Sequence, residues 1–522
     1  MASTSLKSLI LFLSISTISG LNPNSTHLNN LCQSSPYPNA CFESLKLSLS
    51  INISPTILSL LLQSLSAALS QGAHLSSLLS AATLVEKQRG AIQDCRELHQ
   101  ITLSSLRKSI SRLPADSSTK LADARAFLSA AMTNTVTCLD GLESASGPLK
   151  APLLKSLSSI DMQVRNSLSM LGGRQSSGGG NRRRLLAFPQ WMSRKARRIL
   201  EGDEDEYDPG QVLTVAADGT GNFTTISQAI SFSPNNSIDR VIIYVREGVY
   251  RENVEIPSWK PNIVLLGDGS DVTVITGSRS VADGWTTFRS ATMAVSGEGF
   301  LARGITIENT AGPEKHQAVA LRVNADLAAV YRCVIAGFQD TLYVHSFRQF
   351  YRECDVYGTI DYVFGNAAVV FQGCNIVSQL PMPGQFTVIT AQSRESPDED
   401  TGISMQNCSI LATEDLYSSR GSVRSYLGRP WRNYSRAVFL ESYIDEFIAA
   451  EGWTNWDGDQ GLDTLYYGEY ENYGPGSATD GRVSWPGFHV MGYEEASEFT
   501  VSSFITGQEW LDSTSFPYDD QV

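Results

Sequence analysis

A repeat between residues 331 and 366 limits the fold more than any other feature of this sequence. The motif C-x3-G-x2-D occurs twice, 21 residues apart, at Cys333, Gly337 and Asp340 and again at Cys354, Gly358 and Asp361. A fixed period of this length, without helical periodicity, indicates one coil of a solenoid stacked on the next. Stacked coils pair as parallel strands about 4.8 Å apart, so we expect each repeated residue to lie over its counterpart.

The rest of the C-terminal part continues this pattern. From residue 211 onward, short β-branched runs are broken by Gly, Asn and Asp, as expected for many short strands. When these short runs are aligned, the equivalent positions are Gly304, Cys333, Cys354, Cys374, Cys408 and Ser442. The successive spacings between them are 29, 21, 20, 34 and 34 residues. A base coil near 21 residues with loop insertions predicts an all-β right-handed parallel β-helix over residues 208–522. An ordinary β-sandwich is the alternative, but it does not explain a repeat of three residue types.

The repeat also brings cysteines together. Stacking places Cys333 over Cys354, inside the Cα separation of roughly 4.4–6.8 Å that a disulfide needs. We therefore predict a Cys333–Cys354 disulfide. Cys374 and Cys408 remain for a second link between coils, so a Cys374–Cys408 disulfide is predicted as well.

The second consequence of the repeat concerns Asp340 and Asp361. Two carboxyl groups held this close cannot easily both ionise, so the pKa of one of them should rise. A carboxylate beside a carboxylic acid suits acid–base chemistry, although repeats also keep polar residues for stacking alone. Other hydrolytic routes are disfavoured, because the sequence has no G-x-S-x-G or H-E-x-x-H motif and no clustered His/Cys metal set. No metal or other cofactor is expected.

Residues 1–20 predict the compartment. One Lys precedes a short apolar run, and small residues follow it, which is typical of a cleaved signal peptide. The mature chain is therefore expected to be secreted, where its eight cysteines can pair. Candidate glycosylation sites in N-x-S/T sequons are Asn24, Asn52, Asn222, Asn235 and Asn433.

Residues 22–171 differ from the C-terminal part. They are rich in Leu, Ser and Ala, with apolar residues at helical spacing and breaks at Gly and Pro, which predicts an all-α, four-helix-bundle-like domain. Four cysteines in this region allow three pairings, and we favour a local Cys32–Cys41 link with a Cys95–Cys138 link across the bundle.

The two halves are joined by a linker at residues 172–207. A Gly/Ser-rich stretch is followed by two basic runs, at 182–184 and 194–198, and then by an acidic run. Exposed basic runs in a secretory linker predict proteolytic processing, although the choice between the two runs stays open. A merely soluble hinge is the competing interpretation.

Charge separates the halves as well. Residues 1–200 hold 21 Lys and Arg against 9 Asp and Glu, a net charge of +12, whereas residues 201–522 hold 19 against 45, a net charge of −26. The acidic half argues against nucleic acid or an anionic membrane as a partner. The opposite net charges also favour association of the two halves.

Several blocks give the sequence a family resemblance. The helical part resembles the plant invertase and pectin methylesterase inhibitor fold, which uses the cysteine pairing favoured above. The β part is similar to plant pectin methylesterases in three signature blocks, which are GFQDTLY (337–343), GTIDYVFGNA (358–367) and YLGRPW (426–431). Supporting blocks are GWTTFRSATMAV (284–295), QAVALR (317–322) and WPGFHV (485–490).

This resemblance implies roles for individual residues. Asp361 matches the nucleophile, Asp340 the proton donor and later base, and Arg429 the residue that hydrogen-bonds the nucleophile. The amides of Gln317 and Gln339 match the oxyanion donors. Thr287, Gln317, Arg429 and Trp431 match substrate-binding positions.

The resemblance also implies a function. It implies a secreted hydrolase of the plant cell wall that removes methyl esters from homogalacturonan (pectin), releasing methanol and pectate. The helical pro-domain is expected to inhibit the enzyme or assist its folding before cleavage, and separate inhibitor proteins are further possible partners of a monomeric enzyme. Two alternatives stay open: another pectin-active β-helix enzyme, such as a lyase or polygalacturonase, and a non-catalytic wall-binding or inhibitor protein. The complete set of Asp, Arg and Gln residues argues against the latter.

Overall fold

The computed structural model describes residues 32–33, 35–41, 57–81, 86–113, 117–172 and 212–522. The predicted signal peptide, residues 173–207 of the predicted linker and the candidate glycosylation sites Asn24 and Asn52 lie outside the described residues. Of the other sequons, Asn222, Asn235 and Asn433 are exposed. Their glycosylation stays a prediction.

The N-terminal part is a helical bundle, as its apolar spacing predicts. Its long helices are α3 (Ile57–Ala81), α4 (Ala91–Arg112), α5 (Ser118–Glu143) and α6 (Lys150–Gly172). Helix α3 packs against α4 and α6, and α5 packs against the same two helices. Buried Leu, Ile and Ala side chains fill the space between them. No helix among the described residues has the length and apolar character needed to cross a membrane.

Two disulfides hold this bundle, and both are the predicted ones. Cys32 and Cys41 are bonded with their Cα atoms 5.6 Å apart. Cys95 on α4 and Cys138 on α5 are bonded with a Cα separation of 4.8 Å, across 43 residues of chain. Closing a loop of that length stabilises the fold by about 4 kcal/mol in the chain-entropy account.

The C-terminal part is a right-handed parallel β-helix built from three sheets, and every strand pair is parallel. One sheet has eleven strands, in the order β1 (Leu213–Val215), β2 (Val241–Val245), β5 (Ile263–Gly267), β8 (Leu301–Arg303), β11 (Ala328–Tyr331), β14 (Arg348–Arg352), β17 (Ala368–Gln372), β20 (Gly402–Gln406), β23 (Arg436–Leu440), β25 (Tyr466–Tyr470) and β26 (Phe488–Val490). The eight-stranded sheet has β24 (Tyr443–Ile444), β21 (Ser409–Ala412), β18 (Asn375–Ser378), β15 (Asp355–Gly358), β12 (Val334–Ala336), β9 (Thr306–Asn309), β6 (Thr273–Gly277) and β3 (Gly248–Arg251).

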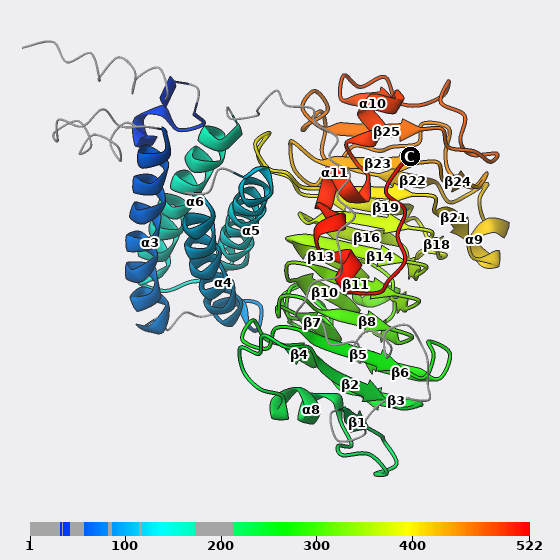
Figure 1. The fold of residues 1–522 in the computed structure, drawn as a ribbon. Coiled ribbons are helices and arrows are strands. Elements are labelled where there is room, and N and C mark those ends of the chain that lie inside the picture. Colours follow the sequence, from blue (N-terminus) through cyan, green and yellow to red (C-terminus); the bar gives the residue numbers. More distant parts are fainter. Residues whose placement is uncertain (1–31, 34, 42–56, 82–85, 114–116, 173–211) are drawn as a thin grey trace, which may run out of the picture.

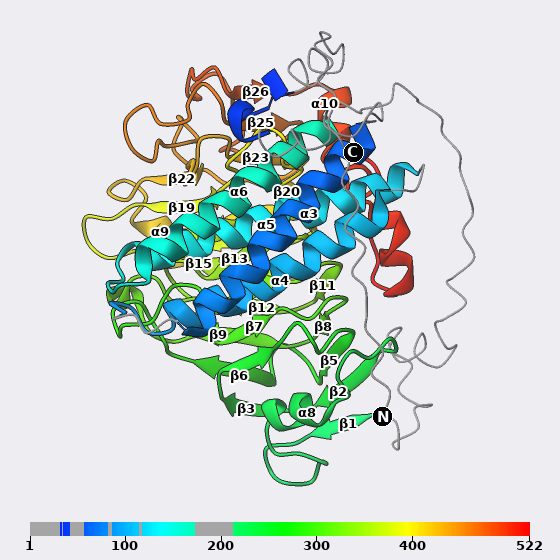
Figure 2. The same cartoon turned by 90° about the vertical axis from the view of Figure 1, so that its left-hand side faces the viewer.

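The third sheet faces the bundle. Its seven strands are β22 (Ser425–Gly428), β19 (Thr387–Gln392), β16 (Ile360–Gly365), β13 (Leu342–Ser346), β10 (Leu321–Asn324), β7 (Met293–Val295) and β4 (Val254–Ile256). Helix α5 contacts β13 (Figure 1). Figure 2 shows the bundle from its outer side, with its helices running obliquely across the stacked coils. The bundle thereby covers the outer face of this sheet.

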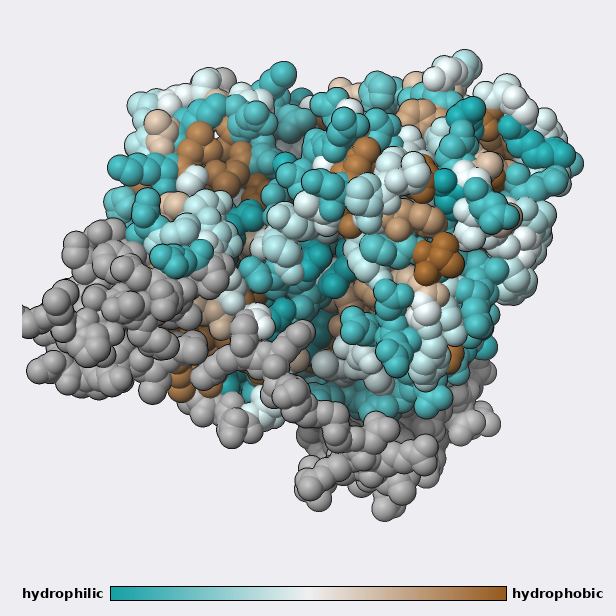
Figure 3. Space-filling view, turned by 90° about the horizontal axis from the view of Figure 1, so that it is seen from above, coloured by the Kyte–Doolittle hydropathy of each residue, from teal (hydrophilic) through white to brown (hydrophobic). Residues whose placement is uncertain are grey.

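Short helices complete the C-terminal part. They are α8 (Ile226–Phe232), α9 (Glu414–Ser418), α10 (Tyr493–Ser497) and α11 (Val501–Ile505), with the 3-10 turns η2 (Pro313–Lys315), η3 (Gly507–Glu509) and η4 (Leu511–Ser513). The C-terminal segment crosses the outer face of the eleven-stranded sheet, where Ile505, Trp510 and Phe516 pack on its apolar residues (Figure 1). From above, the described surface is mainly hydrophilic, with hydrophobic residues in separate small areas (Figure 3).

A turn repeated in each coil explains the period seen in the sequence. The residue between the eleven-stranded and eight-stranded sheets has a left-handed backbone, with φ values of 50° at Arg332, 50° at Glu353, 63° at Gly373 and 49° at Asn407. The following residue, a cysteine in each of these coils, points into the core. The recurring cysteines therefore mark one corner of the β-helix.

The structure contradicts both disulfides predicted for this corner. Cys333, Cys354, Cys374 and Cys408 are buried free thiols. In-register side chains on parallel strands are themselves parallel, so their Cβ atoms stay about 4.8 Å apart, beyond the roughly 3.5–4.5 Å that a disulfide needs. The thiols instead donate to backbone carbonyls, as from Cys354 Sγ to Val330 O at 3.4 Å. The prediction considered the Cα separation but not the direction of the side chains.

This correction can be measured. The mature protein, unfolded in denaturant without reductant, should react with a thiol reagent at four cysteines, because four of the eight are free. The folded protein should react slowly, because all four thiols are buried. Fewer than two reactive thiols in the unfolded protein would support the disulfides predicted from the sequence.

Candidate active site

The two repeated aspartates lie where the sequence places them, on neighbouring coils. Strands β13 and β16 pair with Leu342 opposite Val363, and the amide of Asp340 donates to the carbonyl of Ile360 at 3.0 Å. Asp340 and Asp361 both have left-handed backbones, with φ values of 62° and 52°. Such a conformation costs roughly 1–3 kcal/mol at a non-glycine residue and is typical of functional sites.

Arg429 distinguishes the two carboxyl groups. Its Nε donates to Oδ1 of Asp361 at 2.8 Å and its Nη2 donates to Oδ2 at 2.6 Å. This two-point contact fixes the orientation of the Asp361 carboxylate. No comparable contact to Asp340 is formed among the described residues. Arg429 follows β22 directly, so the same sheet positions all three side chains.

Burial and charge then separate their proton affinities. Burial raises the pKa of Asp361, while the bonded guanidinium of Arg429 opposes that rise. Burial raises the pKa of Asp340 well above the usual range, and the negative charge of Asp361 raises it further. The site therefore favours a protonated Asp340 beside an ionised Asp361, as the repeat and the resemblance predict.

The structure brings all seven predicted site residues together. They line one cavity of about 330 Å³, and they are Thr287, Gln317, Gln339, Asp340, Asp361, Arg429 and Trp431. Gln317 and Gln339 lie on adjacent coils, since the amide of Ala318 donates to the carbonyl of Gln339 at 3.2 Å. Among the described residues, no group of three or more His, Cys, Asp or Glu is arranged to hold a metal ion.

Aromatic rings form one wall of this cavity. Tyr343 and Phe364 stack with centroids 4.1 Å apart, and Phe364 lies 6.0 Å from Trp431. Trp456 stacks on Trp431 at 6.3 Å, and the guanidinium of Arg429 lies 4.2 Å from the Trp456 ring centroid. Sequence reasoning missed Trp456. Its only signal was a Trp in a Gly- and Asp-rich loop.

The bundle also contributes residues to the cavity, and the sequence did not predict which ones. Gln88, Asp94, Thr137 and Asp140 of the N-terminal part line it together with the aspartates. Residue Arg89 pairs with Trp285 as a parallel bridge, and its amide donates to the Gly284 carbonyl at 2.6 Å. The backbone of the N-terminal part thus extends to the cavity rim beside Thr287.

Ion pairs join the two domains, and the positively charged partner lies on the bundle in some of them and on the β-helix in others. Arg125 of α5 contacts Asp400 at 2.6 Å, as the opposite net charges predict. Near the cavity the polarity is reversed, because Asp140 of α5 accepts from Arg432 at 2.7 Å. The basic bundle therefore presents acidic side chains to the cavity rim.

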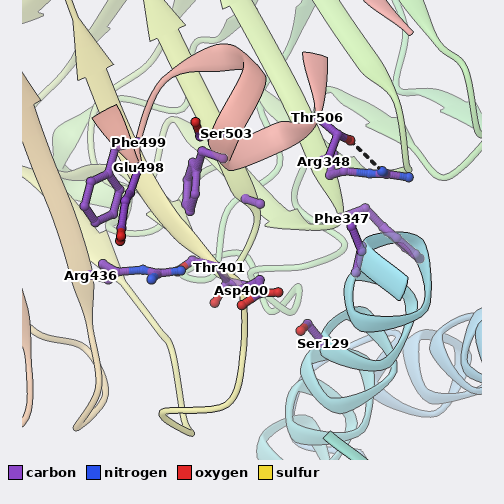
Figure 4. Close-up of a pocket in the computed structure, with 14 residues that line it drawn as sticks. Ser129, Phe347, Arg348, Asp400, Thr401, Arg436, Glu498, Phe499, Ser503 and Thr506 are labelled. Carbon is purple, nitrogen blue, oxygen red and sulfur yellow. Dashed lines mark hydrogen bonds between the residues drawn. The ribbon is translucent and has the colours of Figure 1, made fainter. Parts of the chain in front are cut away.

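A second cavity of about 330 Å³ lies between α5 and the C-terminal helix α11 (Figure 4). Arg436 lines it, with its guanidinium 5.5 Å from the Phe499 ring centroid, and burial lowers the pKa of Arg436 to about 9. None of the predicted site residues lines this cavity. The paired carboxyls and their arginine make the first cavity the candidate active site.

Comparisons with known proteins agree with this assignment. The family model described as pectinesterase matches residues 212–508, and the model described as plant invertase/pectin methylesterase inhibitor matches residues 26–170. A probable pectinesterase/pectinesterase inhibitor of Arabidopsis thaliana is 66% identical over 518 residues, which cover 96% of this chain and 95% of that protein.

Solved structures resemble the β-helix part. The pectin methylesterase from carrot is 52% identical with a TM-score of 0.59, and the match covers 59% of this chain and 98% of that one. The enzyme from Aspergillus niger is 32% identical with a TM-score of 0.51, covering 59% and 97%. The match to those solved chains therefore leaves out about two fifths of this chain. The chain described here belongs to the pectinesterase family and carries an N-terminal domain of the plant invertase/pectin methylesterase inhibitor family.

Proposed function

We propose that this pectinesterase uses Asp361 as its nucleophile and Asp340 as its acid and base. A carboxylate oxygen of Asp361 attacks the methyl-ester carbonyl carbon, and the bond to methanol breaks as Asp340 gives its proton to the leaving oxygen. Asp340, now ionised, then removes a proton from water, and the hydroxide attacks the acyl group. This step releases the galacturonate unit as a carboxylic acid, which loses its proton to water, and it restores an ionised Asp361 and a protonated Asp340. The two-point contact between Arg429 and Asp361 is the observation that carries the proposal.

The remaining residues support the reacting groups. The amides of Gln317 and Gln339 line the same cavity and are suited to donate to the developing oxyanion without a change in their own charge. The stacked rings of Trp431 and Trp456 offer an apolar face to a sugar ring, and Thr287 lines the same cavity. The proposed substrate is therefore methyl-esterified homogalacturonan, in the cell wall outside the secreting cell. No cofactor takes part in the proposed steps.

We also propose that the bundle keeps the enzyme inactive until it is removed. Thr137 and Asp140 line the cavity above the aspartates, and Thr137 is hydrogen-bonded to His345 at 3.0 Å. Thr133 of α5 accepts from Asn366 at 2.9 Å, five residues after Asp361. A polymer cannot follow the outer face of the seven-stranded sheet while α5 lies on it. Cleavage in the predicted linker would release the cover.

Replacing Arg429 tests the roles of the aspartates through pH. The rate should fall at low pH, where Asp361 takes up a proton, and at high pH, where Asp340 loses one. Arg429→Gln removes the cation that lowers the pKa of Asp361, so the acid limb of the rate profile should move to higher pH and kcat should fall. Methanol release by the cleaved protein, followed from pH 4 to 10, measures both.

The matched control is Arg424→Gln, which removes an exposed cation that pairs with Glu451 at 3.0 Å. Its profile should match that of the wild type. An acid limb left unshifted by Arg429→Gln would contradict the assignment of Asp361 as the ionised partner of Arg429.

A further inference from the structure

Two acidic residues of the bundle occupy a pair of arginines beside the active-site cavity. Asp94 and Glu97 are one turn apart on α4. Nε of Arg289 donates to Asp94 Oδ1 at 2.8 Å, and its Nη2 donates to Glu97 Oε2 at 2.8 Å. Nη2 of Arg322 lies 3.4 Å from Glu97 Oε1. Both arginines belong to the enzyme part, and the mechanism proposed above gives neither of them a role.

Hydroxyl groups complete this contact. Thr286 Oγ1 donates to Asp94 Oδ2 at 2.5 Å, and Ser296 Oγ donates to Glu97 Oε1 at 2.9 Å. Two guanidinium groups and two hydroxyls of the enzyme part therefore converge on the two carboxylates of α4. Convergent donors of this kind are the usual recognition elements for a carboxylate.

The arginines have little compensation within their own domain. Arg322 is 1% exposed, and within the described part of the chain its Nε and Nη1 have no hydrogen-bond partner. Its guanidinium lies 3.5 Å from the Phe288 ring centroid. Among the described residues of the enzyme part, Arg289 forms an ion pair only with Glu255, at 3.2 Å, and Glu255 is half-exposed. Removal of α4 would uncover both guanidinium groups and free the donors that Asp94 and Glu97 now occupy, so that another anion can bind them.

The arginine pair lies on the path that a bound polymer would follow. Arg322, Tyr343 and Phe364 occupy the same register position on three successive strands of the seven-stranded sheet. At about 4.8 Å per strand, Arg322 is about 10 Å from the coil that carries Phe364. Thr286, Thr287 and Phe288 also line the cavity that contains Asp340 and Asp361. A chain that extends along the sheet from the reacting ester therefore passes Arg289 and Arg322.

We propose that Arg289 and Arg322, with Thr286 and Ser296, form a subsite for a free uronate carboxylate, and that Asp94 and Glu97 occupy it in the uncleaved chain. The subsite rests on the proposed function, because it assumes a uronate polymer as the substrate. It adds that a polymer unit without its methyl ester is recognised at some distance from the unit that reacts. In the uncleaved chain, the carboxylates of Asp94 and Glu97 take the positions that carboxylates of the polymer would occupy.

Binding of two oligomers tests this subsite without turnover. The protein, cleaved in the 172–207 segment and separated from the bundle, carries Asp361→Asn so that no ester is consumed. Calorimetry measures its affinity for galacturonate hexamer and for the fully methyl-esterified hexamer. Arg289→Gln should weaken binding of the free hexamer about tenfold, because a charge-assisted contact is lost. Binding of the esterified hexamer should change less than twofold.

Arg332→Gln is the matched control. It removes an exposed cation that pairs with Glu353 at 2.8 Å, on a corner away from the seven-stranded sheet. It should leave both affinities unchanged. Should Arg289→Gln fail to fold, Ser296→Ala removes a single hydroxyl donor and should weaken the free hexamer about threefold.

The outcomes separate this proposal from the function itself. Equal affinities for the free hexamer with and without Arg289 would show that the arginines serve only the contact with the bundle. An equal loss for both hexamers would show that Arg289 contacts the polymer without recognising a free carboxylate, and would overturn the subsite as well. Methanol release by the cleaved protein with Asp361 intact is measured in parallel. Its absence would overturn the proposed function, whereas its presence with unchanged hexamer binding would overturn the subsite alone.

Discussion

Asp361→Asn should reduce methanol release by at least about 10³-fold, because an amide cannot act as the nucleophile and no other carboxylate is held by Arg429. The fold should survive the change. Asn is the same size as Asp, accepts and donates hydrogen bonds, and tolerates the left-handed backbone that residue 361 has, with φ 52°. Methanol release from esterified pectin and thermal unfolding of the cleaved protein measure the two effects.

Asp355→Asn is the matched control for this variant. Asp355 lies on β15 of the eight-stranded sheet, where its carboxylate accepts from Asn375 at 2.7 Å. The same substitution there should leave activity within about twofold, as expected for a change that does not affect the site. Near-normal methanol release by the folded Asp361→Asn protein would exclude Asp361 as the nucleophile.

A charge placed at the domain contact should activate the uncleaved chain. Thr133 is buried against Asn366, which also donates to Glu399 at 2.8 Å. Burial raises the pKa of Glu399 to about 7, against the opposing charges of Arg165 and Arg394. At pH 8, Thr133→Glu would therefore bring a second carboxylate close to an ionised one. Like charges about 4 Å apart repel by roughly 4 kcal/mol at an effective dielectric constant of 20.

The expected result is at least a tenfold rise in methanol release by the uncleaved variant at pH 8, because the bundle moves off the cavity more often. The rise should shrink below about pH 7, where Glu399 takes up a proton and the repulsion weakens. Ser66→Glu, on an exposed position of α3, is the control and should have no effect. An uncleaved wild-type chain as active as the cleaved protein would contradict inhibition by the bundle.

The sequence predicted much of this architecture because its repeat reports backbone geometry directly. A residue type that returns every 21 positions requires a coil of that length, and the register of β13 with β16 confirms the stacking of Asp340 over Asp361. The helical spacing of the N-terminal part was predicted for a similar reason, since it depends on local pattern, and the cysteine pairing favoured among three is the one that forms. The positions of Arg429 and Trp431 came from the family resemblance alone.

What the sequence did not predict depends on side-chain direction and on contacts between distant segments. The cysteines of the β-helix satisfy the Cα separation of a disulfide, but their parallel side chains keep them as thiols. Trp456 reaches the cavity through a loop whose path no periodicity describes. No sequence motif singles out Asp94 and Glu97, and only the structure places them on Arg289.

An assay of methanol and new chain ends in the same sample tests the proposed esterase reaction most directly. Methyl-esterified homogalacturonan is incubated with the uncleaved chain, with the protein cleaved in the 172–207 segment and freed of its bundle, and with the cleaved Asp361→Asn variant. We expect methanol without chain scission from the cleaved protein alone. Chain scission without methanol from the cleaved protein, or methanol from the Asp361→Asn variant at the wild-type rate, would contradict the proposed reaction.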